Sequence, residues 1–255
     1  MDMSYAVGVL AMEHIAAGLV QGYRLTGPIR TWPRDAVRAG ALQGVPADQI
    51  SEAIRTLVDE VRDGAALDGI GVGFPGIVRA GIAEESPNLP QMKGYLLERS
   101  LSSALGQPVH VLNDADAAGL AEMRYGAGKG RGGVVVMITL GTGIGCALFL
   151  DGQLVPNTEL GHIEMGGKDA ETIAAASVRD RKGLSWKKYA ERVQSYLKAL
   201  DALIWPDLII IGGGVSKTPE KFLPLIDVRP EVVPAALQNE AGIVGAALAA
   251  SKVTP

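Results

Sequence analysis

Short apolar runs alternate along the chain with longer stretches in which apolar residues recur every three or four positions. The first pattern predicts buried strands, and the second predicts helices with one apolar face. In Asp48–Arg62 the apolar positions define one such face, and Asp48 is a candidate N-cap. The predicted strands are Tyr5–Leu10, Ile15–Val20, Asp68–Val72, Val109–Leu112, Val134–Thr139, Cys146–Leu150, Gln153–Val155 and Leu208–Ile211. The other predicted helices are Leu96–Leu105, Ala117–Tyr125, Ala170–Arg181, Trp186–Ile204 and Ala241–Ala250.

The order of these elements repeats along the chain. Strand hairpins are followed by helices twice, which predicts two related α/β halves with a cleft between them. We expect a smaller N-terminal domain at residues 1–114, completed by the C-terminal helix at 240–255, and a larger domain at residues 115–239.

Composition narrows the class of protein. The chain has 255 residues, of which 47% are hydrophobic and 20% charged, as in soluble globular proteins. Its net charge of −4 lacks the basic footprint of nucleic-acid binding. Cys146 is the only cysteine, which excludes an intramolecular disulfide and a multi-cysteine zinc site. No apolar run approaches the roughly 20 residues of a membrane span, and the N-terminus lacks a basic signal-peptide start. We therefore expect a cytoplasmic protein without a membrane or nucleic-acid partner.

One strand end carries candidate chemistry. The apolar run Val109–Leu112 leads directly into Asn113 and Asp114, with Asp116 two residues further on. In α/β proteins, ligands bind in the crevice beyond the carboxyl ends of strands, so a carboxylate here is a candidate catalytic group. The alternative is that Asp114 or Asp116 only caps the following helix.

Two glycine clusters also follow strands. Gly141, Thr142 and Gly143 come after Val134–Thr139, where backbone N–H groups and a hydroxyl could contact an anion. The triplet Gly212–Gly214 follows the last buried strand and could let a flat ligand lie on the backbone. Each cluster could instead be a structural turn, but two of them after two strands favour a phosphate-bearing ligand.

Glu159 and His162 form a third candidate group. They lie three residues apart, so both side chains could enter one pocket. Together with Glu164 they could bind a metal, or they could hydrogen-bond a polyol. Few other metal ligands are available, so hydroxyl recognition is favoured. The remaining alternative is a buried histidine satisfied by a neighbouring carboxylate.

Several long, ordered stretches resemble one family. They are GVGFPGIV (71–78), VLNDADAAGLAEMRYGAGKG (111–130), TLGTGIGCALFLDGQLVPNTELGH (139–162), DLIIIGGGVSK (207–217), KFLP (221–224) and NEAGIVGAAL (239–248). In these stretches the chain resembles the ROK-family sugar kinases, and most of all their polyphosphate glucokinase branch. The resemblance implies two actin-like/ribonuclease H-like α/β domains flanking a central cleft. The cysteine-rich zinc motif of many ROK proteins is absent after Gly161-His162, so we expect no structural zinc.

The resemblance also implies roles for matching positions. Asp114 would be the general base that takes the proton from the 6-hydroxyl of a hexose such as glucose. The phosphate donor would be polyphosphate or ATP, with Mg²⁺ bridging the phosphates. ROK kinases are usually dimers, so a homodimer is implied. The implied sugar ligands are Asn88, Asn113, Glu159, His162 and Glu171, and the implied phosphate or nucleotide contacts are Thr139, Gly141, Thr142, Gly143, Gly212, Gly213 and Gly214.

The first phosphate turn departs from the family pattern. ROK kinases carry Asp-x-Gly-Gly-Thr/Ser after the first strand, whereas here Leu10 takes the aspartate position and Met12 and Glu13 replace the glycines. Leucine cannot support a metal, although Glu13 or His14 could take over part of that role. Two hypotheses follow, a working hexose kinase or a catalytically impaired relative that binds a sugar as a sensor or subunit. A DNA-binding ROK repressor is disfavoured, since the sequence before Tyr5 has no room for a helix-turn-helix.

Overall fold

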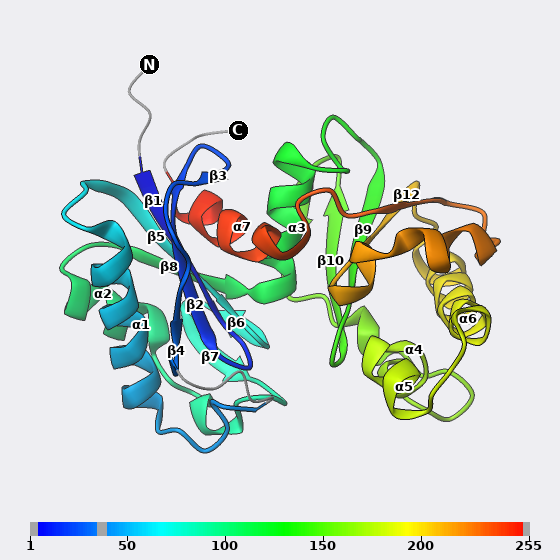
Figure 1. Ribbon diagram of the computed structural model, residues 1–255, viewed down its shortest axis with the longest axis horizontal. Coiled ribbons are helices and arrows are strands. Elements are labelled where there is room, and N and C mark those ends of the chain that lie inside the picture. The colour runs from blue at the N-terminus through cyan, green and yellow to red at the C-terminus, as the bar shows by residue number, and fades with distance from the viewer. Residues whose placement is uncertain (1–4, 35–39, 252–255) are drawn as a thin grey trace. The chain divides into compact units, whose positions relative to one another are not determined.

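The computed structural model describes residues 5–34 and 40–251, with every side chain in these ranges except that of Asn239. The chain forms two compact units (Figure 1). The first comprises the described residues of 1–121 and 240–255, and the second comprises residues 122–239. Among the described residues, no helix combines the length and apolarity that crossing a bilayer requires.

A mixed sheet forms the centre of the first unit. Its strands follow the order β3-β2-β1-β5-β8, and β4 pairs with β2 beside β3. The central three strands, β1, β5 and β8, run parallel, so their carboxyl ends share one edge. The bounds are β1 Tyr5–Ala11, β2 Ile15–Gln21, β3 Arg24–Leu25, β4 Arg30–Trp32, β5 Leu67–Phe74 and β8 Val109–Asn113. The small sheet of β6 Ile77–Arg79 and β7 Ile82–Glu85 is separate.

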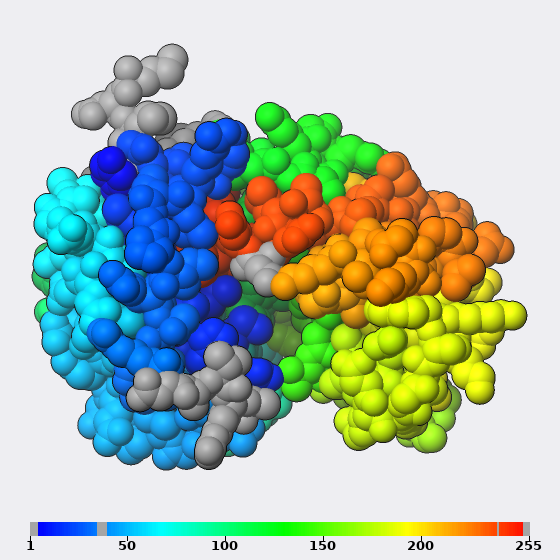
Figure 2. Space-filling view, viewed as in Figure 1, coloured from blue at the N-terminus to red at the C-terminus, as the bar shows by residue number. Residues whose placement is uncertain are grey.

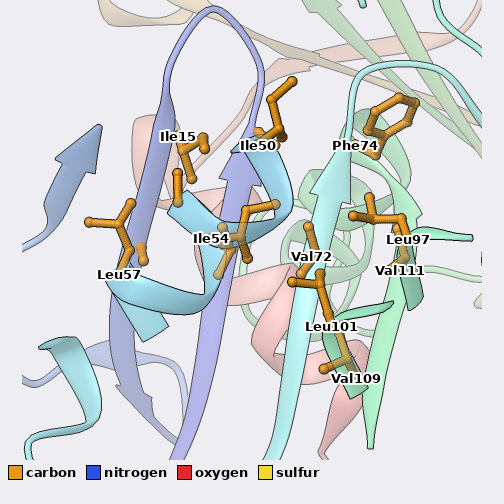
Figure 3. Close-up of a cluster of buried hydrophobic side chains, with 14 of the residues drawn as sticks. Ile15, Ile50, Ile54, Leu57, Val72, Phe74, Leu97, Leu101, Val109 and Val111 are labelled. Carbon is orange, nitrogen blue, oxygen red and sulfur yellow. The ribbon is translucent and has the colours of Figure 1, made fainter. Parts of the chain in front are cut away.

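Helices α1 (Ala47–Arg62) and α2 (Leu97–Leu105) cover one face of this sheet (Figure 1). Figure 3 shows their apolar side chains packed on those of β2, β5 and β8. The predicted cap of α1 is wrong: Pro46 is the N-cap, and Asp48 lies within the first turn. A carboxylate in the first turn still interacts favourably with the positive end of the helix dipole.

Helix α7 (Ala241–Ala250) covers the opposite face at very short range. A Cβ added to Gly8 would lie 1.9 Å from the carbonyl oxygen of Ile243, and one added to Gly71 would lie 1.7 Å from that of Ala246. The small residues of α7 and the strand glycines therefore allow backbone-to-backbone contact. This contact is why the last helix of the chain belongs to the first unit.

The second unit repeats the strand order of the first. Its sheet runs β11-β10-β9-β12-β13, with β9, β12 and β13 parallel and β9-β10-β11 antiparallel. The predicted pair of related α/β halves is thus confirmed. The bounds are β9 Val134–Leu140, β10 Ile144–Leu150, β11 Gln153–Val155, β12 Leu208–Gly212 and β13 Glu231–Pro234.

Helix α6 (Trp186–Ile204) packs on one face of this second sheet and ends where the pattern predicted. The single helix predicted over Ala170–Arg181 is wrong. It is divided into α4 (Glu171–Ala174) and α5 (Ala176–Arg181), because Ala175 has an extended ψ of 151°. The remaining elements are α3 Asp114–Tyr125 and the short 3-10 turns η1 Pro90–Met92, η2 Leu160–His162, η3 Gly214–Lys217, η4 Pro219–Lys221, η5 Leu223–Leu225 and η6 Gln238–Glu240.

The contact between α7 and β5 predicts a stability effect. We expect Gly71→Ala to lower the free energy of unfolding by about 3 kcal/mol, because the new methyl group must displace the α7 backbone. Gly27→Ala is the matched control, since its Cβ would meet nothing within 4 Å. Denaturant titration followed by circular dichroism measures both, and equal midpoints for the two variants would contradict the expectation.

Candidate active site

The end of β8 is fixed by the side chain of Asn113. Its Oδ1 accepts hydrogen bonds from the backbone N–H groups of Ala115 at 2.8 Å and Asp116 at 3.0 Å. Asn113 is therefore the side chain that satisfies the first turn of α3, and the helix begins at Asp114 rather than at the predicted Ala117. Its amide nitrogen donates to the carbonyl oxygen of Gly76 at 3.1 Å. The second N–H of the Asn113 amide could donate a hydrogen bond to a hydroxyl group of a ligand.

The turn at Pro75–Gly76 connects Asn113 to the segment that carries Asn88. The buried Ser86 hydroxyl donates to the carbonyl oxygen of Pro75 and accepts from the backbone N–H of Leu89 at 3.0 Å. A Cβ on Gly76 would lie 2.2 Å from the carbonyl oxygen of Glu85, so glycine is required for this approach. Asn88 is exposed on the segment between these two anchors.

Asp114 is half-buried at the start of α3, and its Oδ1 accepts from the backbone N–H of Ala115 at 2.9 Å. The neighbouring side chain is apolar. Leu10 fills the space over two glycines, since a Cβ on Gly73 would lie 2.7 Å, and one on Gly242 2.6 Å, from its methyl carbons. The aspartate position of the family is therefore occupied by a packed leucine.

In the second unit, His162 lies at the centre of a polar cluster. Its Nδ1 is 2.7 Å from Oδ2 of Asp169, and its Nε2 is 3.9 Å from Oε2 of Glu159, too far for a hydrogen bond. Asp169 is itself fixed, because its Oδ1 accepts from the backbone N–H of Glu171 at 2.9 Å. The hydroxyl of Tyr196 donates to the carbonyl oxygen of Leu160 at 3.2 Å and holds the η2 turn. The cluster leaves Nε2 of His162 and the carboxylate of Glu159 able to contact a ligand.

Two pKa values in this cluster are shifted. The hydrogen bond that His162 donates to Asp169 is the main cause that raises the pKa of His162, and the charges of Asp169, Glu171 and Glu159 act in the same direction. Burial is the main cause that raises the pKa of Glu159, partly offset by the nearby His162. A protonated His162 donates from both ring nitrogens, so Nε2 can donate to a hydroxyl while Glu159 accepts from one.

Glu171 lies against the turn of Gly141, Thr142 and Gly143, which is called the phosphate turn here because the sequence predicts phosphate contacts for it. Its Oε2 accepts from the backbone N–H of Ile144 at 2.9 Å. A Cβ on Gly143 would lie 2.0 Å from that same oxygen, so a side chain there would displace the carboxylate of Glu171. The predicted sugar ligand Glu171 and the predicted phosphate residue Gly143 are thus in direct contact.

The phosphate turn borders a cavity of about 430 Å³ that lies entirely within the second unit. Gly141 and Thr142 line it, and so does Gly214 from the glycine triplet. Ser177 fixes the turn, since its N–H donates to the carbonyl oxygen of Gly141 at 3.0 Å and its hydroxyl to that of Thr142 at 2.6 Å. The other lining residues are Leu140, Ala176, Ser177, Arg179, Asp180, Trp186, Val215 and Thr218.

The other predicted phosphate residues have structural roles beside this cavity. Thr139 lies within β9, and Gly212 ends the buried strand β12. Gly213 has a φ of 79°, and a Cβ there would lie 2.4 Å from the carbonyl oxygen of Leu140. Gly214 alone of the triplet has open space at its Cβ position. The triplet therefore combines one glycine with open space, Gly214, and one that the backbone requires, Gly213.

No group of three His, Cys, Asp or Glu side chains within the described residues is arranged to hold a metal ion. The packed Leu10 offers no ligand atom beside Asp114. Hydroxyl recognition by Glu159 and His162 stays a prediction.

Sequence reasoning missed Asp169 and Ser86, which hold the predicted ligands in place. Asp169 lies two residues before the first residue of α4 and accepts a hydrogen bond from the N–H of Glu171, and an aspartate just before a helix is a signal available in the sequence. Ser86 precedes a proline loop and carries no comparable signal. The contact of Asp169 with His162 and that of Ser86 with the carbonyl oxygen of Pro75 form only in the folded chain, so spacing alone does not identify them.

Comparison with known proteins gives one family. The ROK family model matches residues 41–177. Polyphosphate glucokinase of Mycobacterium tuberculosis is 48% identical over 200 residues, which cover 77% of this chain and 76% of the relative.

Solved structures agree. Inorganic polyphosphate/ATP-glucomannokinase from Arthrobacter sp. strain KM matches with a TM-score of 0.86 at 41% identity, covering 96% of this chain and 98% of that one. ROK hexokinase from Thermus thermophilus matches with a TM-score of 0.77 at 26% identity, covering 96% and 97%. The predicted α/β fold class is confirmed.

The contact between His162 and Asp169 predicts a titration. We expect Asp169→Asn to lower the pKa of His162, because the variant removes the carboxylate that stabilises the imidazolium. In the native protein, the raised pKa of His162 stabilises the folded state fully at pH values below the ordinary pKa of histidine. This contribution to stability is lost as the pH rises through the raised pKa. NMR titration of the imidazole resonances measures the change, with His14 and His110 as internal controls. An unchanged His162 pKa would refute the assignment.

Proposed function

The chain belongs to the ROK family, and from this premise we propose that it is a hexose kinase that transfers a phosphoryl group from polyphosphate or ATP to the 6-hydroxyl of glucose. The observation that carries the proposal is the placement of Asp114, a half-buried carboxylate at the carboxyl end of the central parallel strands. The relatives named above share this activity class by name.

In the proposed reaction, the oxygen of the sugar 6-hydroxyl attacks the terminal phosphorus of the donor, and Asp114 accepts the proton of that hydroxyl. The bond from that phosphorus to the leaving phosphate oxygen breaks, and the shortened donor leaves with the electron pair. Phosphoryl transfer demands positioning and charge stabilisation more than covalent help from the protein. Asn113 supports this role, because its bonds to the first turn of α3 fix the backbone of Asp114.

The sugar hydroxyls are assigned to two groups of side chains. The first group, in the first unit, is Asn88 and Asn113, and Asn113 is bonded to the Pro75–Gly76 turn. The second group, in the second unit, is Glu159 and His162, and Asp169 orients the ring of His162. Amide, carboxylate and imidazole groups together can donate to and accept from sugar hydroxyls. Glu171 is the weakest of the proposed ligands, because one of its oxygens is bonded to the backbone of Ile144.

Magnesium is proposed to enter with the donor. Because the described residues hold no metal cluster and Leu10 is apolar, the ion is assigned as the counter-ion of the phosphates rather than as a resident cofactor. Gly141 and Thr142 are proposed to contact those phosphates from the cavity wall. A homodimer in the cytoplasm stays a prediction of the family resemblance, which size-exclusion chromatography with light scattering tests in part.

The alternative hypothesis is a sugar-binding protein that lacks kinase activity. It rests on Leu10, Met12 and Glu13, which replace the metal-supporting and phosphate-facing residues of the family turn. The named relatives do not favour it, since all three carry kinase names. A kinase with an altered phosphate-donor site would also explain why Leu10, Met12 and Glu13 differ from the family pattern.

The proposal predicts the effect of removing the base. Asp114→Asn should lower kcat by at least about 10²-fold, because an amide cannot take the proton of the 6-hydroxyl. The amide keeps the shape of the side chain and can still accept from the backbone N–H of Ala115, so glucose binding should persist. A coupled assay for glucose 6-phosphate, together with calorimetric titration of glucose, measures both quantities.

Asp48→Asn is the matched control, since it makes the same change at an exposed position on α1. Its kcat should equal that of the wild type. If the wild type binds glucose but produces no glucose 6-phosphate with ATP–Mg²⁺ or with polyphosphate, the kinase proposal fails and the sugar-binding alternative is established.

A further inference from the structure

The side chains of Arg179 and Trp186 form a stacked pair that lines the same cavity as the phosphate turn. The Cζ atom of Arg179 lies 3.8 Å from the ring centroid of Trp186, and both residues line the cavity with Gly141 and Thr142. Arg179 is on α5 and Trp186 is the first residue of α6. Sequence reasoning did not identify either residue, because neither belongs to a recognisable motif.

The position of Arg179 is tied to the phosphate turn. Ser177, two residues before it, bonds to the carbonyl oxygens of Gly141 and Thr142. This short connection keeps the guanidinium and the phosphate turn on the wall of one cavity. The orange segment that contains η3–η5 lies beside the yellow α6 in Figure 2, and Phe222 of that segment stacks on Trp186.

The guanidinium keeps unused hydrogen-bonding capacity. Its Nη1 donates to Oδ1 of Asp180 at 2.7 Å, while its Nε is buried and meets no acceptor in the described part of the chain. The Asp180 side chain is 72% exposed, so this ion pair contributes little and can yield to an incoming anion. A planar guanidinium held flat on an indole ring is preorganised for phosphate oxygens.

Other side chains already contact the indole ring of Trp186. Arg179 covers one face, and the Phe222 ring lies 5.9 Å away at an interplanar angle of 21°. Nζ of Lys221 is 5.6 Å from the same ring centroid and adds positive charge nearby. The hydroxyl of Thr218 and the guanidinium of Arg179 also line the cavity, and both can donate hydrogen bonds to a phosphate chain.

We propose that Arg179, held in place by Trp186, binds the phosphate chain of the donor in this cavity, and that the contact sets donor affinity without base stacking. The inference rests on the proposed function for the identity of the donor. Phosphate-chain binding itself can be measured without turnover, so the two can fail separately.

The test is calorimetric titration of tripolyphosphate and, separately, of ATP into the full chain. Arg179→Gln should weaken tripolyphosphate binding about tenfold or more, since a charge-assisted and geometrically matched contact is lost. The affinity of Arg179→Lys for tripolyphosphate should lie between that of the wild type and that of Arg179→Gln, because lysine keeps the positive charge but lacks the planar guanidinium group. Arg181→Gln is the matched control, for it removes the same charge from the same helix outside the cavity lining and should leave the affinity nearly unchanged.

Trp186→Leu separates a positioning role from base stacking. We expect it to weaken tripolyphosphate and ATP equally, and to have little further effect in combination with Arg179→Gln, because the indole acts through the guanidinium. A loss confined to ATP would instead make Trp186 a base-binding surface and overturn the inference. Circular dichroism melting identifies any variant that unfolds, and the lysine variant then carries the comparison.

The remaining outcomes are also decisive. Unchanged tripolyphosphate binding in both Arg179 variants, an equal loss in Arg181→Gln, or no binding to the wild type would overturn the inference. In the coupled assay the Arg179 variants should raise the donor KM and leave the glucose KM unchanged. If binding depends on Arg179 but the wild type phosphorylates no sugar, the phosphate-chain site stands and the proposed kinase function fails.

Discussion

The hydrogen bonds of the Asn113 side chain hold together the edge of the first unit that carries Asp114. The side chain joins the end of β8, the first turn of α3 and the Pro75–Gly76 turn through three hydrogen bonds. Gly76 and Asp116 are buried, so removing the Asn113 side chain would take a hydrogen-bond partner from the carbonyl oxygen of Gly76 and from the N–H of Asp116, each costing about 1–3 kcal/mol. Asp114 is the next residue along the chain, so its position as the proposed base is a consequence of this capping arrangement.

The first hairpin of each unit has the same backbone hydrogen bond although the two loop sequences differ. Between β1 and β2 the N–H of Met12 donates to the carbonyl oxygen of His14 at 3.1 Å, and between β9 and β10 the N–H of Gly141 donates to that of Gly143 at 3.0 Å. None of these loop residues, all of which the structure describes, has the positive φ that would require glycine. The hairpin backbone therefore tolerates both sequences. Gly143 instead leaves room for the carboxylate of Glu171.

Periodicity predicted most of the fold because burial dictates it locally. Trp186–Ile204 matches α6 at both ends, and the predicted strands match the observed ones to within one or two residues. The break at Ala175 was not predictable, because alanine favours helix and only the hydrogen bonds of Ser177 to the phosphate turn reveal the change of direction. The partners of the site residues were missed for a similar reason. Asp169 and Arg179 act on groups that the folded chain brings to them.

These differences indicate which departures from the family pattern carry functional meaning. At Gly213 a side chain would collide with the Leu140 backbone, so glycine there is a requirement of the fold, whereas at Gly143 a side chain would only displace the carboxylate of Glu171. At Met12 and Glu13 no such requirement exists, and Leu10 packs well against Gly73 and Gly242. Replacing the family residues at these three positions therefore costs the fold little. The altered first turn is therefore compatible with an intact scaffold, and under the proposed function donor binding is expected to depend more on the cavity of the second unit.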